Sequence, residues 1–133
     1  MYVLPALLRK FILAKKNNKK SVTIWGTGSP LREFLHSDDL ASACLFLMLN
    51  YNKPGIINIG VGKDISILDL AKTVKEIVGF KGQILTDPKK PDGTPRKLMD
   101  VSKLTKLGWK AEIKLERGIR MVYDEIKERN WSN

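Results

Sequence analysis

Residues 22–41 constrain the fold most, because they read as a strand, a glycine-rich turn, a second short strand and a helix in immediate succession. Apolar, partly β-branched residues flank the turn and are typical of half-buried strands, with Phe34-Leu35 predicted to form the second one. The glycines and the proline between them predict the turn. Asp38 or Asp39 is the expected N-cap of the helix that runs to about Asn50, because a short carboxylate accepts from first-turn N–H groups.

The rest of the chain also alternates helices with strands. Apolar spacing predicts helices over 4–14, 67–78, 102–107 and a terminal segment containing Leu115 and Ile126, and buried or short strands over 56–59 and 83–86. Ser66 and Gly79 are typical caps for the helix between them. This alternation predicts an α/β fold with short strands and packed helices. The 133 residues suit a single domain, 1–133.

Composition excludes several classes of function. The only cysteine, Cys44, allows no internal disulfide and favours a reducing compartment, hence a cytoplasmic location. Its apolar neighbours predict a thiol packed in the core. The only histidine, His36, has no second His or Cys near it, so no metal site is expected. No apolar run approaches the ~20 residues that cross a bilayer, so no membrane association is expected.

The formal net charge of +10 favours anionic ligands in general. Lysine runs are most often solvated surface, and no helix-turn-helix, zinc-finger or RNA-recognition pattern accompanies them. A basic nucleic-acid-binding domain therefore stays as the weaker alternative.

Two segments predict a ligand site. Trp25 and Arg32 stand at the two ends of the glycine-rich loop, as a planar base or a phosphate would require, although a buried Trp and a solvated Arg are equally expected. The segment 90–97 is rich in Pro and Gly, and it carries the carboxylate of Asp92 with flanking cations. Such a rigid loop suits a polyhydroxylated anionic ligand.

Two further patterns are misleading. The Gly60-Val61-Gly62 segment lies between a predicted strand and a helix, but Ile65 replaces the third glycine of a dinucleotide-binding loop. Tyr123 and Lys127 have the Tyr-x-x-x-Lys spacing of short-chain reductases. They lie in the terminal helix, where Tyr123 is more simply expected to pack against apolar neighbours.

Together, these motifs closely resemble the C-terminal part of GDP-L-fucose synthase, an extended short-chain dehydrogenase/reductase of the NAD-dependent epimerase/dehydratase superfamily. The matching segments are Ile24–Gly28, Arg32–His36, Asp38–Ala41, Asn58–Ser66 and Lys90–Asp100. The resemblance implies an enzyme that epimerises GDP-4-keto-6-deoxy-D-mannose at C3 and C5 and reduces C4 with NADPH. It also implies a substrate-binding region, residues 1–133, without the NADP-binding Rossmann half.

The resemblance places GDP-sugar contacts on five residues: Lys10, Trp25, Arg32, Asp92 and Lys97. It implies that Lys10 and Arg32 bind the diphosphate, that Trp25 forms an apolar wall and that Asp92 accepts from hydroxyl or base groups.

The sequence also departs from the family at several positions. Tyr2 stands where the family has a histidine near the cofactor, and the cofactor loop and the catalytic Tyr, Lys, Cys and His have no counterparts here. Cys44 and His36 are not those residues. NADP(H) is therefore expected for the complete enzyme and not for this chain alone, which we expect to be inactive.

Three further alternatives concern the state of the chain. It is a fragment or the product of a truncated reading frame, it is a stand-alone or split sugar-nucleotide-binding module complemented by an N-terminal NADP-binding domain, or it is a remnant. A remnant is expected to aggregate or to form a homodimer through an exposed apolar face.

Overall fold

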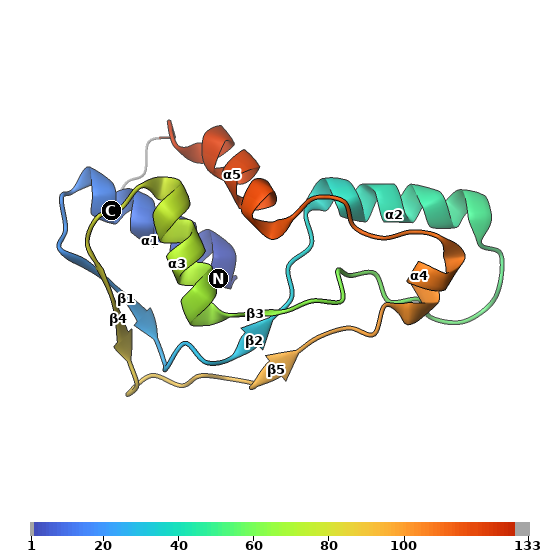
Figure 1. Ribbon diagram of the computed structural model, residues 1–133, viewed down its shortest axis with the longest axis horizontal. Coiled ribbons are helices and arrows are strands. Elements are labelled where there is room, and N and C mark those ends of the chain that lie inside the picture. Colours follow the sequence, from blue (N-terminus) through green and yellow to red (C-terminus); the bar gives the residue numbers. More distant parts are fainter. Residues whose placement is uncertain (1, 130–133) are drawn as a thin grey trace.

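A computed structural model describes residues 2–129 and divides into two groups of elements (Figure 1). The larger group contains α1 (Val3–Lys16), β1 (Ser21–Trp25), α3 (Ile67–Val78), β4 (Gln83–Asp87) and α5 (Leu115–Ile126). The smaller group contains α2 (Ser37–Asn50) and α4 (Ser102–Leu107). The short strands β2 (Leu31–Arg32), β3 (Ile65–Ser66) and β5 (Arg96–Lys97) lie between the two groups.

The larger core forms where α1 packs on β1 of the parallel pair β1 and β4, and where α3 packs on α1 and α5. Alternation along β1 buries Val22 and Ile24 and turns Trp25 outward. Phe11 of α1 is fully buried, and its ring centroid lies 5.6 Å from that of Phe80. This core fixes the end of β1, from which the candidate site extends.

The central sheet is small and mixed, with strand order β3-β2-β5. β2 pairs antiparallel with β3 and parallel with β5. This arrangement joins the segment after the glycine-rich turn to the segment 96–97, which lies far along the chain. The fold is α/β with short strands and packed helices, as the alternation of elements predicts.

The helices at 4–14, 67–78, 102–107 and in the terminal segment are confirmed, as are the strand at 83–86 and both caps of α3. Gly79 ends α3 in the left-handed region, with φ +73°. None of the described helices combines the length and the apolar character needed to span a membrane.

Two local predictions after the turn are wrong. The second strand is Leu31–Arg32, and Phe34-Leu35 lies beyond it. The N-cap of α2 is His36, whose Nδ1 accepts from the Asp38 N–H at 3.1 Å. Asp39 is instead buried, and its carboxylate accepts from the Glu112 and Ile113 N–H groups. The carboxylate predicted as a cap thus holds α2 against the segment before α5.

Two burial predictions are also wrong. Residues 56–59 form no strand, and Ile56 is 87% exposed. Cys44 is exposed on α2 and is not packed in the core. Ile56 and Cys44 both lie in apolar sequence, but no described residues pack over their side chains.

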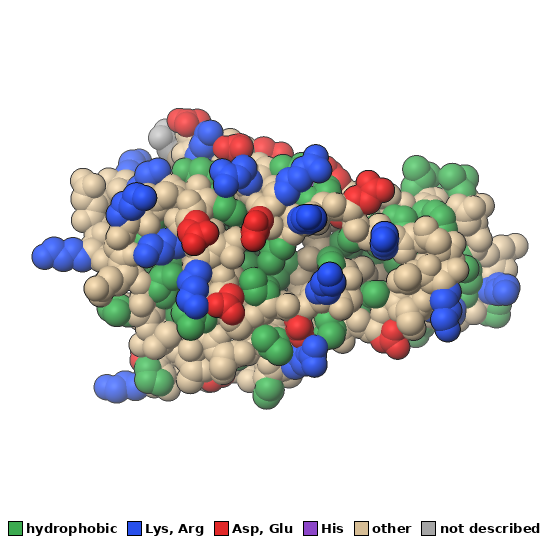
Figure 2. All heavy atoms as spheres, viewed as in Figure 1, with side chains coloured by type: hydrophobic (Ala, Val, Ile, Leu, Met, Phe, Trp, Pro, Cys, Tyr) green, Lys and Arg blue, Asp and Glu red, His purple; other side chains and the backbone are tan. Residues whose placement is uncertain are grey.

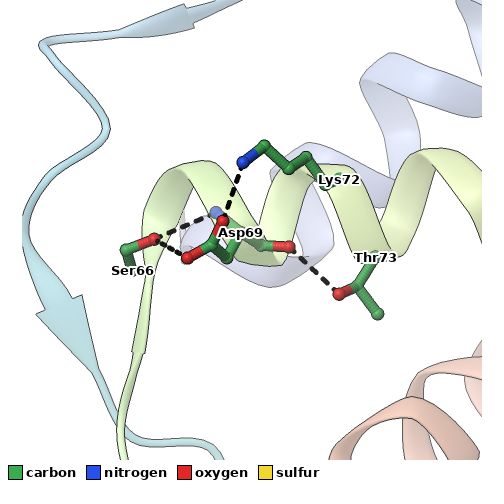
Figure 3. A network of polar contacts seen from close by, with 4 residues as sticks. All are labelled: Ser66, Asp69, Lys72 and Thr73. Atoms are coloured by element: carbon green, nitrogen blue, oxygen red, sulfur yellow. Dashed lines mark hydrogen bonds and ion pairs between the residues drawn. The ribbon is translucent and has the colours of Figure 1, made fainter.

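The first turn of α3 is closed by a network of polar contacts around Asp69 (Figure 3). Ser66 Oγ accepts from the Asp69 N–H at 3.0 Å and donates to the Asp69 carboxylate at 2.8 Å. Lys72 Nζ donates to the same carboxylate at 2.9 Å. The Lys72 ammonium, followed by the Ser66 hydroxyl, holds the pKa of Asp69 below its usual value of 3.8.

This network predicts a pH dependence of stability. Because the folded-state pKa of Asp69 is lowered, its contribution is fully present above pH 3.8 and is lost as the pH falls through the folded-state pKa. The Asp69→Asn variant should therefore lose less stability on acidification than the parent, measured by thermal unfolding from pH 6 to about pH 2. Glu76→Gln on the same helix is the control. Equal acid sensitivity of parent and Asp69→Asn would contradict the prediction.

Candidate functional site

Trp25 ends β1 and is 65% exposed, so it is not the buried Trp of the simpler interpretation. Lys10 Nζ lies 6.0 Å and Lys90 Nζ 5.3 Å from its ring centroid. Lys10 Nζ also donates to the Thr23 carbonyl at 3.0 Å. An exposed aromatic plane with two ammonium groups beside it suits a ligand that has both a flat and an anionic part.

A cleft of about 390 Å³ lies beside this aromatic plane. Lys10 and Trp25 form its rim, and apolar side chains form the remainder. The full lining is Val3, Ala6, Leu7, Lys10, Ile24, Trp25 and Ile67. Its place between α1 and the end of β1 follows from the packing of α1 on that strand.

Asp92 lies against the turn that follows β1. Its carboxylate accepts from the Thr27 N–H at 2.6 Å and from the Thr27 hydroxyl at 2.8 Å. Gly26 has φ +74°, and a Cβ there would overlap the Asp92 carboxylate, so the close approach requires glycine. In this structure both Asp92 oxygens hold the two loops together.

Arg32 and Lys97 are neighbours across the central sheet. They form a pair in the parallel register of β2 and β5, and such pairs place their side chains on the same face. Both line a second cleft of about 360 Å³. Arg32 Nη1 donates to the Leu31 carbonyl at 2.7 Å, and among residues 2–129 neither cation forms an ion pair. Their charge is therefore left for an anion.

Glu33 holds the wall of this second cleft in place. Its Oε2 accepts from the Val61 and Gly62 N–H groups, each at 2.6 Å, and its Oε1 accepts from the Met99 N–H at 3.1 Å. A Cβ on Gly60 would come within 2.6 Å of Oε2, so a larger residue there would displace the Glu33 carboxylate. One carboxylate thus joins the strand that carries Arg32 to the segments on either side.

The structure brings the five predicted residues into two adjoining groups. Lys10 and Trp25 form the first group, Arg32 and Lys97 the second, and the Asp92 loop lies between them. A Cβ on Gly93 would lie 3.7 Å from Arg32 Nη2, which shows how near this loop is to the second group. Tyr2 lines neither cleft and is 87% exposed.

The Gly60–Gly62 segment is unsuited to a cofactor pyrophosphate. The two N–H groups that such a loop would present to phosphate, those of Val61 and Gly62, already donate to Glu33. Tyr123 packs against the larger core, and Lys127 Nζ donates to Asp124 at 3.0 Å. The Asp124 hydrogen bond raises the pKa of Lys127. Neither pattern therefore forms a cofactor site here.

Sequence reasoning did not assign Lys90, Thr27 or Glu33 to the site. Lys90 reaches Trp25 because Asp87 pairs with Trp25 in register and its carbonyl accepts from the Lys90 N–H at 3.1 Å. This contact depends on the pairing of β1 with β4, which cannot be predicted from the sequence near either strand alone. For Glu33, a signal was present, since an acidic residue stands directly between Arg32 and the apolar pair Phe34-Leu35.

Comparison with known proteins gives related chains. The profile of the NAD dependent epimerase/dehydratase family matches residues 2–60. The chain is 56% identical over 123 residues to putative GDP-L-fucose synthase 2 of Arabidopsis thaliana, covering 92% of this chain and 38% of the relative. It is 47% identical over 136 residues to GDP-L-fucose synthase of Escherichia coli K12, covering 96% of this chain and 42% of the relative.

A solved structure agrees with these relatives. The GDP-mannoheptose C4 reductase from Campylobacter jejuni with NADP bound is 46% identical and has a TM-score of 0.83, covering 93% of this chain and 44% of that one. The chain spans about two-fifths of the length of the curated relatives named above, 38% and 42%.

Proposed function

Because this chain belongs to the NAD-dependent epimerase/dehydratase family and aligns over 92% of its length with a GDP-L-fucose synthase, we propose that it is the sugar-nucleotide-binding part of such an enzyme. The reaction proposed for the complete enzyme converts GDP-4-keto-6-deoxy-D-mannose to GDP-L-fucose by 3,5-epimerisation and reduction at C4. We take residues 1–133 as one binding domain that acts in the cytoplasm.

The observation that carries this proposal is the pair of cations on neighbouring strands. Arg32 and Lys97 share one cleft and form no ion pair among the described residues, and the Glu33 carboxylate in the same cleft accepts from backbone N–H groups, so a diphosphate is the ligand whose charge the two cations match. The Arg32 guanidinium suits phosphate because it donates in a fixed planar geometry. Next to this cleft, the Trp25 ring offers a flat, apolar contact for the base or the sugar, and Lys10 and Lys90 lie beside the ring.

The role of this chain in the reaction is to bind and orient the substrate. NADPH supplies the hydride for reduction when it is bound, and the described residues offer no glycine loop with free N–H groups at 60–62 to hold it. Asp92 keeps its loop on the turn beside Trp25, so its first role is to position the binding surface. Its remaining lone pairs are available to a sugar hydroxyl.

Calorimetric titration with GDP and GDP-mannose tests the binding site. We expect saturable binding by the parent chain and a loss of about tenfold or more in affinity for Arg32→Ala, since a hydrogen bond to a charged group contributes about 1.5–3 kcal/mol. Trp25→Ala should lose a similar factor, because an aromatic contact to a base contributes about 1–3 kcal/mol. Lys89→Ala, an exposed lysine that lines neither cleft, is the matched control.

Two outcomes of this titration would count against the proposal. A folded parent chain that binds neither nucleotide contradicts it directly. Equal losses in Lys89→Ala and Arg32→Ala would indicate that total charge, and not the cleft, attracts the ligand.

We also propose that the chain alone does not turn over substrate and that a complementing NADP-binding domain is required. Purified chain mixed with NADPH and the keto-sugar should show no oxidation of NADPH at 340 nm above a buffer control. Turnover by the chain, free of host enzyme, would contradict this part of the proposal and leave the binding site intact.

A further inference from the structure

The charged residues near the start of the chain are all positive. Residues 1–32 contain seven Lys and Arg residues and no Asp or Glu, so Glu33 is the first acidic residue of the sequence. Lys10 and Arg32 belong to the candidate site, but the four lysines of residues 15–20 lie at the C-terminal end of α1 and in the loop to β1. The proposed sugar-nucleotide site does not use these four charges.

Folding places a fifth lysine beside these four. Lys15 Nζ donates to the Val78 carbonyl at the end of α3 at 2.8 Å, and the Gln83 N–H donates to the Lys20 carbonyl at 2.9 Å. These bonds hold the α1–β1 loop next to the α3–β4 connection, which contains Lys81. Figure 1 shows the two connections together at the end of the molecule opposite to α2, and Figure 2 shows Lys and Arg side chains standing out there.

Lys15 lines two clefts at this end of the molecule. The first has a volume of about 350 Å³, and Lys19 and Lys81 also line it. The second has a volume of about 500 Å³, and its basic lining residues are Lys15, Lys16, Lys127 and Arg129. Glu128 is the acidic residue of this lining, and Lys127 is paired with Asp124 at 3.0 Å. Clefts lined mainly by charges of one sign concentrate the electrostatic potential.

Local structure accounts for only part of this charge. Lys15 and Lys16 stand in the last turn of α1, where the helix dipole favours a positive charge. Lys19, Lys20 and Lys81 lie outside the helices, so the dipole does not explain them. Within residues 2–129, none of these five lysines forms an ion pair. Their mutual repulsion is therefore relieved only by an anion from outside the described chain.

We propose that Lys15, Lys16, Lys19, Lys20 and Lys81, the lysine surface, bind a linear chain of phosphates. This binding is separate from the proposed function. A chain of phosphates can occupy both clefts, because Lys15 lines each of them. Lysine suits such a ligand, since its ammonium is a compact charge on a flexible stem and needs no fixed ligand geometry.

The chemistry of the lysine surface argues against two other kinds of polyanion contact. The exposed large hydrophobic side chains among the described residues all lie outside 15–20 and 79–83. Apolar side chains that insert into a bilayer strengthen membrane binding, and exposed aromatic rings stack the bases of single-stranded nucleic acids. The lysine surface offers neither, and its clefts are concave where a bilayer is flat. The contact is therefore with phosphates alone.

Two probes that share a phosphate chain test the proposal. Polyuridylate has bases and inorganic polyphosphate has none. The affinity of the parent chain for labelled polyuridylate is measured by fluorescence anisotropy at several salt concentrations, with unlabelled polyphosphate or GDP as competitor. We expect polyphosphate to displace the labelled probe completely and saturating GDP to leave it bound.

The triple variant Lys16→Glu, Lys19→Glu, Lys81→Glu removes lysines from both clefts and retains the Lys15 bond to α3. We expect its affinity for polyuridylate to fall at least about tenfold, because each phosphate contact contributes to a steep salt dependence. The slope of log K against log salt should become less steep by about two, since a single strand releases about 0.7 counterion per contact. The affinity of this variant for GDP should equal that of the parent.

The matched control is the triple variant Lys53→Glu, Lys106→Glu, Lys110→Glu. It changes the net charge by the same amount at exposed lysines that line neither of these clefts. We expect its affinity to fall less than about threefold, because exposed charges farther than a Debye length from the ligand are largely screened. Circular dichroism and thermal unfolding establish that both variants are folded.

Lysine acetylation of the parent chain gives a second measurement that needs no variant. The chain reacts with an N-hydroxysuccinimide ester of acetate, and mass spectrometry follows each lysine. We expect polyphosphate to slow the acetylation of Lys16, Lys19 and Lys81 at least about fivefold, because only the unbound fraction reacts freely. Lys53 should react at an unchanged rate.

Several results would overturn the proposal. A folded parent chain that binds neither probe at low salt rejects it, as does equal acetylation with and without polyphosphate. Equal losses in the two triple variants would mean that net charge alone attracts the probe. Displacement by GDP would place the probe in the sugar-nucleotide site, and bound polyuridylate that polyphosphate does not displace would indicate recognition of bases. Binding only to phosphatidylserine vesicles would assign the lysine surface to a membrane.

Discussion

Glu33→Ala should lower the free energy of unfolding by about 3 kcal/mol, although the side chain is only half-buried and far from the larger core. Three backbone N–H groups, those of Val61, Gly62 and Met99, lose their charged acceptor together. Because these groups border the Arg32 cleft, GDP affinity should fall as well. Urea denaturation followed by circular dichroism measures the first effect, and calorimetry at a temperature where the variant is folded measures the second.

Glu33→Gln separates positioning from simple loss of packing. It keeps the size of the side chain but replaces one accepting oxygen by a donor group, so the parent bonds to Val61 and Met99 cannot both form. We expect an intermediate loss of both stability and GDP affinity. Glu125→Ala, exposed on α5, is the control for removing a carboxylate. A loss of less than about 1 kcal/mol in Glu33→Ala would show that water replaces the carboxylate without cost.

Phe11→Ala should lower the free energy of unfolding by about 3–5 kcal/mol, because its fully buried ring leaves a cavity that the packed neighbours cannot fill. The ring packs against Phe80 in the layer between α1, α3 and β1. A chain of this size has about 5–15 kcal/mol of stability in total, so this loss is a large part of it. Thermal and urea unfolding measure this directly.

Phe46→Ala is the matched aromatic control. Phe46 is only half-buried and packs on the edge of the smaller core, so its removal should cost clearly less than that of Phe11. Equal losses would mean that the smaller core contributes as much to global stability as the larger one. The ranking assigned to the two cores would then be wrong.

Sequence reasoning succeeds where the decisive interactions are local. Ser66 and Gly79 mark both ends of α3 because a hydroxyl cap and a left-handed glycine act within one turn of the chain. The β1 strand is equally predictable, since alternation alone determines which of its side chains are buried. Trp25 and Arg32 were proposed from one loop, and the structure places each of them in a cleft.

The incorrect predictions share one physical cause. The hydrophobicity of a side chain indicates that its burial is favourable, but it does not indicate whether the fold supplies neighbours that bury it. Cys44 and residues 56–59 have the composition of buried elements and lack described neighbours on one side. The predicted cap of α2 is wrong for another reason. The Asp39 carboxylate accepts from the distant N–H groups of residues 112 and 113, and His36 caps the helix instead. Partners far along the chain are not visible in a local pattern.

Because β2 and β5 lie far apart along the chain, the cleft that contains Arg32 and Lys97 can form only late in synthesis. Arg32 and Lys97 are register partners, and Thr27 and Asp92, which close the adjoining loop, are 65 positions apart. During synthesis on the ribosome, Trp25 and Arg32 therefore emerge long before the residues that complete the clefts. Such non-local pairing closes slowly, so the Arg32 and Lys97 pair is expected to form late in folding. A ligand that needs both of these cations can therefore stabilise the chain only after residue 97 has been synthesised.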